Sequence, residues 1–539
     1  MLGLPTRDAG PDAPKLLFVK ARIEDHVGEA SAPAQAPMLL GAVARQRGWE
    51  VRTVDAYLEA DPAGAVAAAL ARFPATVVGM TALTAEYRSL HELARVARRA
   101  RPSAVVLAGG AHASADPDDV LANEAIDAAV IGEGERTLEE VLDRVRAESP
   151  WRDAAGLAVR GPGGRVVRAR PRPVIEELDS LPFPAWDLTD VDAYAKLRGM
   201  SLTGLRRYMP LTTSRGCPYR CTYCHDIQGK RFRAHSAEYV LRMIDELRAR
   251  HGVHHFDLTD DIFNFDPERM LAICDGLIAR GPGIGFTCPN GVRGDRLTVE
   301  QADRMARAGC EYVAIAIETA TPRLQKQIKK NLRFDKVQPI IAAFTERNVF
   351  TAGFFMVGFP TETEAELRAT IDYAVRSKLH AAFFFVVTPF AGTDLHEHVV
   401  EGMGRAAAEL TGSGFYFRPV ENLSQVPQPR FDALRREAYL RFYLDPRRMA
   451  RIWRAYPRKL DLAEYASLML VRDALRIDPG RVLGPLSRAL TRAREALAPA
   501  RQARAEAAPP RATRATAAAP TAPHASSPAM DERRRLPLA

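Results

Sequence analysis

The sequence predicts an α/β protein with two consecutive β/α regions and a helical C-terminal region. Over residues 14–150, short β-rich runs alternate with amphipathic helical stretches, and the alternation returns with longer helices over residues 207–390. Alternation of this kind is typical of parallel sheets with helices packed on both faces. Apolar residues make up 47% of the 539 residues, which is enough to build the cores of several domains.

Residues 14–150 are expected to form a doubly wound, Rossmann-like domain. Its strands are predicted at Lys15–Lys20, Glu50–Asp55, Thr76–Met80, Ala104–Ala108 and Ala128–Ile131. Its helices are predicted at Met38–Arg47, Ala65–Phe73, Leu90–Arg99 and Leu138–Val145. In such folds a ligand binds outside the carboxyl ends of the strands. Gly109–Gly110 and Gly132–Glu135 follow the fourth and fifth strands and therefore lie at that edge, although tight turns would also explain them.

Residues 151–206 are predicted to connect the two β/α regions. Leu157–Val159 and Val166–Val167 flank a glycine-rich turn, which is the pattern of a β-hairpin. The segment Pro171–Pro184 is rich in proline and is expected to be a linker that runs over the surface.

Residues 207–390 are expected to form a partial (β/α)6, TIM-like barrel. Its strands are predicted at Tyr208–Thr213, His255–Leu258, Gly285–Cys288, Tyr312–Ile317, Thr351–Val357 and Ala382–Thr388. A closed barrel of this kind has eight units, so an array of six leaves one side open. A bulky substrate or a second domain could reach the strand ends through that side.

The remainder of the chain divides into a helical region and a tail. Residues 391–498 have helical patterning, and the aromatics Phe415, Tyr416 and Phe417 would either pack in a core or line an apolar pocket. Residues 499–539 are rich in Ala, Pro, Arg and Thr and are predicted to be disordered, because they bury too little apolar surface to offset the entropy of ordering.

The charge distribution and the termini limit the location and the partners. The net charge is +9, but residues 480–539 hold eleven arginines, no lysine and four acidic residues. The body of the chain is therefore nearly neutral, which does not indicate a nucleic-acid-binding protein. The N-terminus lacks the pattern of a signal peptide, and no apolar run approaches the length of a membrane helix. We expect a cytoplasmic protein with neither a membrane span nor a nucleic-acid partner.

Three cysteines give the clearest chemical signal. Cys217, Cys221 and Cys224 have the spacing CxxxCxxC in a loop directly after a predicted strand. Three thiolates on one short loop can converge on a single metal centre. Cubane iron–sulfur clusters usually take four thiolates, so three would leave one iron free to bind a substrate or cofactor, as the open position of a catalytic zinc does.

Two other interpretations of this loop remain. The cysteines could be buried without a metal, or they could form a Cys3His zinc site with His225, although neighbours such as Cys224 and His225 rarely both bind one ion. The other cysteines, Cys274, Cys288 and Cys310, are scattered and are interpreted as small buried apolar side chains. The sequence therefore predicts one cluster and no auxiliary cluster.

With these motifs the sequence resembles the radical S-adenosylmethionine (SAM) superfamily. The cysteine loop follows the first strand of a (β/α)6 pattern, and Tyr223 lies between the second and third cysteines. Phe256–Phe263 looks like the second-strand motif whose acidic end meets the SAM amino group, and Asn290–Arg293 resembles the third-strand segment whose arginine faces the SAM carboxylate. Ala314–Thr319 looks like the fourth-strand motif that holds the ribose, and Met356–Glu362 like the fifth-strand motif beside the adenine.

This resemblance implies a set of cofactor-binding residues. It implies that Cys217, Cys221 and Cys224 hold a [4Fe–4S] cluster. The residues implied in binding SAM are Tyr223, Asp260, Asp261, Arg293, Glu318, Gly358 and Pro360. A carboxylate is a suitable acceptor for an ammonium group or a ribose diol, which agrees with these roles.

The N-terminal region resembles the cobalamin-binding domain of one branch of this superfamily. Thr81–Leu83 is similar to its S/T-x-L segment, Gly109–His112 to its GG segment, and Val130–Arg136 to its usual ending. The resemblance implies cobalamin contacts from Thr81, Leu83, Gly109 and Gly110. Domains that supply a histidine ligand to cobalt carry D-x-H-x-x-G, whereas Ile23–Gly28 has these residue types at another spacing, so we expect base-off cobalamin with no ligand from His26.

The resemblance implies an enzyme that cleaves SAM reductively and, with cobalamin, methylates an unactivated carbon of a small molecule. The substrate class we expect is a natural product or a lipid-like molecule, and the implied partner is an electron donor such as flavodoxin or ferredoxin. One alternative is a cobalamin-associated cyclisation, ring rearrangement or oxidation without methyl transfer. A remote alternative is a non-enzymatic metal-cluster regulator, which would need a DNA-reading motif that we do not find in the sequence.

Overall fold

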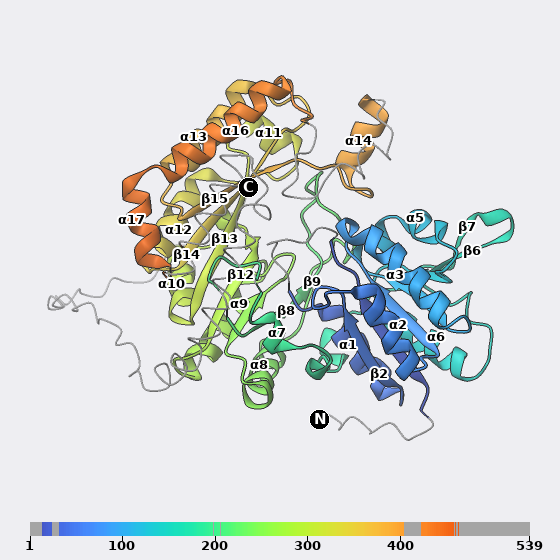
Figure 1. Ribbon diagram of the computed structural model, residues 1–539. Coiled ribbons are helices and arrows are strands. Elements are labelled where there is room, and N and C mark those ends of the chain that lie inside the picture. Colours follow the sequence, from blue (N-terminus) through green and yellow to red (C-terminus); the bar gives the residue numbers. More distant parts are fainter. Residues whose placement is uncertain are drawn as a thin grey trace, which may run out of the picture. The chain divides into compact units, whose positions relative to one another are not determined.

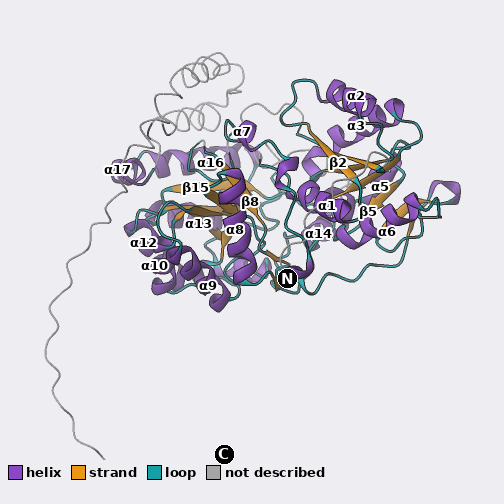
Figure 2. Cartoon of the chain, turned by 90° about the horizontal axis from the view of Figure 1, so that it is seen from below, coloured by secondary structure: helices purple, strands orange, loops and turns teal. Residues whose placement is uncertain are grey.

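The computed structural model describes residues 13–23, 32–197, 199–204, 206–403 and 422–456, together with Lys459 and Leu462 (Figure 1). Two sheets organise these residues, and helices lie outside the strands of each sheet (Figure 2). The predicted α/β class is therefore confirmed. His26, the aromatics Phe415, Tyr416 and Phe417, and the predicted disordered tail all lie outside the described residues.

The N-terminal sheet has seven strands in the order β2-β1-β3-β4-β5-β6-β7. The parallel strands are β1 (Lys15–Lys20), β2 (Glu50–Asp55), β3 (Val77–Thr81), β4 (Val105–Gly109) and β5 (Ala128–Val130). The predicted hairpin, β6 (Leu157–Arg160) and β7 (Val166–Arg168), adds two antiparallel strands to the edge of this sheet. The hairpin thus belongs to the N-terminal sheet, although we placed it in the connector.

Helices cover both faces of this sheet because side chains alternate along each strand. Leu17 and Val19 face one core, with α2 (Pro62–Arg72), α3 (Tyr87–Ala100) and α5 (Pro117–Ala122). Leu16 and Phe18 face the other core, with α1 (Gln35–Gln46) and α6 (Glu135–Arg146). The turns after β3 and β4 carry two short elements, η1 (Thr84–Glu86) and α4 (Ala111–Ala115).

The connector is more buried than its composition suggested. It contains η2 (Pro162–Gly164), η3 (Leu178–Ser180), η4 (Trp186–Leu188) and α7 (Val191–Tyr194). Ile175, Leu178 and Leu181 form a small buried cluster, and Trp186 is buried in the core of the second region. The proline-rich segment runs over the surface as expected, with only Ile175, Leu178 and Leu181 buried.

The second sheet contains six parallel strands in the order β15-β14-β13-β12-β11-β8. These strands are β8 (Tyr208–Leu211), β11 (His255–Leu258), β12 (Gly285–Val292), β13 (Cys310–Glu318), β14 (Phe350–Val357) and β15 (Ala381–Val386). The helices of this region are α8 (Ala237–His251), α9 (Pro267–Ala279), α10 (Val299–Arg307), α11 (Pro322–Gln327), α12 (Phe334–Glu346) and α13 (Glu364–Arg376), with η5 (Gly294–Arg296) between β12 and α10. Among the described strands, β8 and β15 each pair on one side only, so the expected open, partial barrel is confirmed.

The described helices after the barrel are α14 (Asp394–Met403), α16 (Gln428–Tyr443) and α17 (Pro446–Ala455). Of these, α16 packs against the last barrel strand, whereas Leu395 and Val399 of α14 belong to a separate cluster with Phe359. On β15, the backbone N–H groups of Ala382 and Phe384 donate hydrogen bonds of 3.2 Å to the hydroxyls of Tyr443 and Tyr439. Helix α16 therefore satisfies edge amides that have no neighbouring strand. Among the described residues, no helix combines the length and apolar character that a membrane span requires.

Candidate active site

The cysteine loop is closed at its base by a two-stranded ladder. The strands β9 (Ser214–Arg215) and β10 (Arg233–Ala234) pair antiparallel on either side of it. Gly216 has a φ of 80°, and a Cβ atom there would lie 2.3 Å from the Arg231 carbonyl oxygen. A glycine is therefore required just before Cys217, because the backbone is left-handed and closely packed at this point.

The three cysteines of this loop lie close enough to influence one another electrostatically. Burial raises the pKa of Cys217, and the nearby Asp261 carboxylate and Cys221 thiolate raise it further. Burial also raises the pKa of Cys224 to about 12, with further increases from Cys221 and Cys217, although one side of Cys224 is exposed to solvent. Thiolates that repel one another fit a cationic centre, because a bound metal replaces the protons and reverses the repulsion.

The other cysteines are separate from this loop. Cys274, Cys288 and Cys310 are all buried in the core of the barrel, with exposures of 0%, 2% and 6%. They are placed as the small apolar side chains that we expected. His225, which a zinc site would recruit, is exposed, and its carbonyl oxygen accepts a hydrogen bond from Lys230.

The two aspartates after β11 have different surroundings. Asp260 is buried, and its carboxylate accepts hydrogen bonds from the backbone N–H groups of Thr213 and Ser214 and from the Thr213 hydroxyl, at 2.5, 2.8 and 2.6 Å. These contacts occupy both oxygens, so Asp260 is placed as an anchor for the start of the cysteine loop. Asp261 is partly buried and accepts a 3.2 Å hydrogen bond from the Gly216 backbone N–H. Of the two, Asp261 has the carboxylate that is less engaged.

Glu318 at the end of β13 is held in an unusual conformation by a buried partner. Its φ is 67°, a left-handed value that few residues other than glycine adopt. Its carboxylate lies 2.7 Å from Lys330 Nζ, and both side chains are less than 10% exposed. Lys330 Nζ is also 3.4 Å from the hydroxyl of Tyr223 in the cysteine loop. Lys330 therefore joins the fourth-strand carboxylate to the loop, and the sequence analysis did not identify it.

Arg293 is placed after β12 with its guanidinium fully engaged. It forms two 3.0 Å contacts with Asp295 and donates a hydrogen bond to the Lys330 carbonyl oxygen. The guanidinium also lies 4.1 Å from the ring centre of Tyr219, which belongs to the cysteine loop. Arg293 thus lies beside the loop, but it would have to exchange a partner to bind a carboxylate.

The loop after β14 is organised by Glu362. Its carboxylate accepts hydrogen bonds from the backbone N–H groups of Gly358 and Phe359, at 2.5 and 3.2 Å, and the side chain is completely buried. Burial raises the pKa of Glu362 to about 7. Pro360 is buried in the same turn, and Phe359 contacts Tyr223 edge-on with 6.1 Å between ring centres. Glu362 was within the predicted motif, but its role as the anchor of the loop was not identified.

The predicted cobalamin contacts lie together at the carboxyl edge of the N-terminal sheet. Thr81 and Gly109 end the neighbouring strands β3 and β4. A Cβ atom on Gly110 would lie 2.8 Å from Thr81 Oγ1 and 3.0 Å from the Ala82 carbonyl oxygen, so only glycine fits there. The side chain of Leu83 is 51% exposed at this edge. An open edge of glycines with a projecting apolar side chain fits the close approach of a large, flat ligand.

This edge contacts the second sheet through Gln35, the first residue of α1. Its side-chain oxygen accepts a 2.7 Å hydrogen bond from the Thr212 backbone N–H, and its nitrogen donates one of 2.7 Å to the Thr259 hydroxyl. Thr212 follows β8, and Thr259 follows β11. The start of α1 is therefore tied to the carboxyl ends of two strands in the second sheet.

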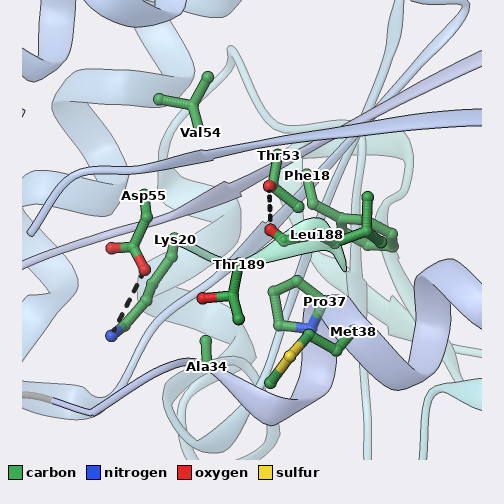
Figure 3. Close-up of a pocket in the computed structure, with 10 residues that line it drawn as sticks. All are labelled: Phe18, Lys20, Ala34, Pro37, Met38, Thr53, Val54, Asp55, Leu188 and Thr189. Carbon is green, nitrogen blue, oxygen red and sulfur yellow. Dashed lines mark hydrogen bonds and ion pairs between the residues drawn. The ribbon is translucent and has the colours of Figure 1, made fainter. Parts of the chain in front are cut away.

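A small cavity near this contact is too small for a cofactor. It lies at the carboxyl ends of β1 and β2, where Lys20 and Asp55 form an ion pair of 3.9 Å beside Leu188 and Thr189 of the connector (Figure 3). Its volume of about 20 Å³ is enough for one water molecule. We therefore interpret it as a packing gap between the N-terminal sheet and the connector.

A histidine cluster lies beside a surface groove on the N-terminal domain. Nε2 of His91 and Nε2 of His112 lie 3.0 and 2.9 Å from the same oxygen of Asp119, and their hydrogen bonds hold the pKa of Asp119 far below its usual value. Asn123 donates through Nδ2 both to the His91 carbonyl oxygen and towards His91 Nδ1, and its Oδ1 accepts from the Ala125 N–H. These side chains therefore form one connected hydrogen-bonded cluster.

Two domain families match the chain. The model of the radical SAM superfamily matches residues 211–374, and the model of the B12-binding domain matches residues 30–142. The first match spans the cysteine loop and the strand ends around it, and the second covers most of the N-terminal sheet. A B12-binding domain and a radical SAM domain are therefore both present.

The chain is similar to curated proteins and to solved structures along most of its length. An uncharacterized methyltransferase of Pyrococcus horikoshii is 29% identical over 80% of this chain and 93% of its own length. Cytidylyl-2-hydroxyethylphosphonate methyltransferase of Streptomyces wedmorensis is 27% identical over 66% of this chain and 76% of its own length. The radical SAM methyltransferase TsrM from Kitasatospora setae, solved with cobalamin and a [4Fe–4S] cluster, has a TM-score of 0.62 at 18% identity, over 81% of this chain and 82% of that one.

The chain therefore combines a B12-binding domain with a radical SAM domain. The resemblance inferred from the cysteine loop and the N-terminal edge is thereby confirmed, and so is the expectation of an enzyme. Neither match identifies which individual residues contact a cofactor.

Proposed function

We propose that the protein is a cobalamin-dependent radical SAM methyltransferase that methylates an unactivated carbon of a small molecule. The observation that carries this proposal is the contact between the N-terminal domain and the strand ends of the barrel. Gln35 ties the start of α1 to Thr212 and Thr259, which follow the barrel strands β8 and β11. This contact supports a reaction shared between the two candidate cofactor sites, because the active sites of such barrels lie at the carboxyl ends of the strands.

Cys217, Cys221 and Cys224 would hold the [4Fe–4S] cluster, and S-adenosylmethionine would bind at its free iron. When bound, the cluster would supply the electron that cleaves S-adenosylmethionine, and cobalamin would supply the methyl carrier. The chain would hold the loop rigid through Asp260 and would keep solvent away with Tyr223 and Phe359. An external electron donor such as flavodoxin or ferredoxin would supply the reducing equivalents.

The strand ends would bind S-adenosylmethionine through both acidic and basic side chains. Asp261 would accept from its ammonium group, and Glu318 would accept from its ribose hydroxyls. Lys330 and Arg293 are the cations beside the loop that could face its carboxylate, each by exchanging a present partner. Gly358 and Pro360 would lie along the adenine, in the turn that Glu362 holds in shape.

Cobalamin would lie on the N-terminal edge, over Thr81, Leu83, Gly109 and Gly110. The glycines allow close approach of the backbone, and the exposed side chain of Leu83 would be covered by the ligand. Binding of the base-off form without a histidine ligand is part of this proposal. It predicts no nitrogen splitting from the protein in the paramagnetic resonance spectrum of the reduced cobalt.

The substrate class that we propose is a natural product or a lipid-like molecule, with the enzyme acting in the cytoplasm. A second candidate reaction is radical cyclisation or oxidation without methyl transfer. It is favoured by a 25% identical relative, the anaerobic magnesium-protoporphyrin IX monomethyl ester cyclase of Rubrivivax gelatinosus, which matches 60% of this chain and 58% of that protein. A product heavier than its substrate by one CH2 unit would distinguish methylation from this alternative.

The direct test is anaerobic reconstitution with iron, sulfide and cobalamin, followed by reduction in the presence of S-adenosylmethionine. We expect iron and sulfide at the level of one cluster, bound cobalamin, and release of 5′-deoxyadenosine. Cys221→Ala should abolish 5′-deoxyadenosine, whereas Cys274→Ala, a buried cysteine of helix α9, should not. Production of 5′-deoxyadenosine by Cys221→Ala would contradict the proposal.

A further inference from the structure

Four charged side chains form a buried cluster between the N-terminal domain and the cysteine loop. Arg215 contacts Glu133 at 3.1 Å and Glu135 at 2.5 Å, and Arg233 contacts Glu133 at 2.7 Å. The side chains are between 2% and 12% exposed. We call these four residues the charge clamp.

The clamp joins the two segments on which the cofactors depend. Glu133 follows Gly132 after β5, and Glu135 begins helix α6, so both lie on the edge where we propose that cobalamin binds. Arg215 lies two residues before Cys217, and Arg233 lies on β10, where the chain leaves the cysteine loop. One end of the clamp therefore belongs to the cobalamin edge, and the other end includes both strands at the base of the cluster loop.

The clamp has features that stability alone does not explain. Buried ion pairs lose most of their attraction to the cost of desolvation, so they are a weak source of stability. Among the described residues, Glu135 Oε2 is buried without a hydrogen-bond partner, which adds a further cost. Yet burial does not neutralise Glu133, because contacts with the Ile175 backbone and with both arginines lower its pKa. Such an arrangement fixes the register of two surfaces.

A neighbouring ion pair of the same loop shows the contrast. Arg231 pairs with Glu176 of the connector, but these side chains are 70% and 50% exposed. An exposed pair is screened by water and constrains its partners weakly. Arg231→Gln is therefore a suitable control, since this substitution removes an arginine from the same loop and leaves the four clamp residues in place.

We propose that the charge clamp sets the position of cobalamin relative to the iron–sulfur cluster, with Arg215, Arg233, Glu133 and Glu135 as positioning residues for both. This inference rests on the proposed function. The clamp does not contact the reacting atoms; it holds the loop that presents the cluster against the edge that presents the cobalamin. Changing a glutamate of the N-terminal domain should therefore alter the environment of a cluster that is bound about eighty residues later.

The test measures the magnetic coupling between cob(II)alamin and the reduced cluster by pulsed electron paramagnetic resonance in the full-length protein. The variants are Glu135→Gln, Arg215→Gln, the double variant of both, and the control Arg231→Gln. We expect one resolved coupling in the wild type and in the control, and loss of that single coupling in each of the three clamp variants. The double variant should match Arg215→Gln, because both remove the contacts of Arg215 with Glu133 and with Glu135.

The outcomes separate this inference from the proposed function. If the clamp variants bind both cofactors and keep the wild-type coupling, the clamp is structural and the inference is wrong. If Glu135→Gln fails to fold, the neutral Arg215→Gln/Glu135→Gln pair still provides the comparison, because it leaves neither of these two charges unpaired. If the wild type binds the cluster and cleaves S-adenosylmethionine but binds no cobalamin, the cobalamin part of the proposed function fails, and the inference fails with it.

Discussion

Asp260 provides the sharpest test of how the cysteine loop is held. Its carboxylate accepts three hydrogen bonds, from two backbone amides and one hydroxyl, at the point where the chain leaves β8 for the cysteines. Asp260→Ala would leave these three donors without their acceptor. Each buried donor left unpaired costs about 1–3 kcal/mol of stability. The Thr213 hydroxyl can rotate towards another acceptor and so recover part of its cost, so we expect the free energy of unfolding to fall by about 3–6 kcal/mol.

Asp260→Asn should destabilise the protein less than Asp260→Ala does. The amide keeps one acceptor oxygen, and its NH2 group can donate to the Thr213 hydroxyl, which rotates to accept. We expect a loss of about 1–2 kcal/mol for this variant. The free energy of unfolding in urea gives these values, and iron bound per chain after anaerobic reconstitution reports the state of the loop. The bound iron should fall in both variants, and it should be lower in Asp260→Ala than in Asp260→Asn.

Asp261 is the matched control for this experiment. It is the next residue, it is partly buried, and it accepts a single 3.2 Å hydrogen bond from Gly216. Asp261→Ala should cost less than about 1 kcal/mol of stability, and should weaken binding of S-adenosylmethionine instead. Equal losses of stability for the two alanine variants would refute the assignment of Asp260 as the anchor.

Three further predictions concern buried charged groups. Lys330→Met leaves the Glu318 carboxylate buried without its cation, so urea unfolding should show a loss of about 3–5 kcal/mol, and adding Glu318→Gln should restore most of it; no recovery would contradict the pairing. The pKa of Glu362 is raised from 4.5 to about 7, so the folded state holds its proton more tightly, and stability should fall by about 3 kcal/mol as the pH rises from 4.5 to 7; the slope over this range should be shallower in Glu362→Gln. Arg448 is fully buried and donates to the Val375 carbonyl in the last turn of α13 and to the Leu379 carbonyl just beyond it, so Arg448→Met should lower the free energy of unfolding by about 2–4 kcal/mol, whereas a change below about 1 kcal/mol would show that these carbonyls find other donors.

The sequence predicted the elements whose signals are local. Alternation of apolar residues located the parallel strands, and the CxxxCxxC spacing located the metal loop. The roles of Asp260 and Lys330 depend on contacts between distant segments, which no local pattern reports. Lys329 and Lys330 are adjacent and chemically identical, yet Lys329 is 57% exposed and Lys330 only 6%, because Glu318 lies beside one of them and not the other.

The connector and the charge clamp show the same limit. In the sequence, Glu133 and Glu135 belong to the segment that ends the N-terminal domain, whereas Arg215 lies just before the cysteine motif. Nothing in the sequence indicates that these residues form ion pairs. The proline-rich segment was predicted to lie on the surface because of its composition. Most of it is not buried, but the cluster of Ile175, Leu178 and Leu181 that anchors it becomes visible only when the chain is folded.

The two phenols of α16 also determine how copies of this enzyme can meet. A strand with bare outward amides is a template on which another chain can add a strand of its own. On β15 the amides of Ala382 and Phe384 already donate to Tyr443 and Tyr439, and the helix that carries these tyrosines occupies the space an incoming strand would need. Growth of the sheet from one molecule into the next is therefore blocked at this end, even though the described strands leave the barrel open.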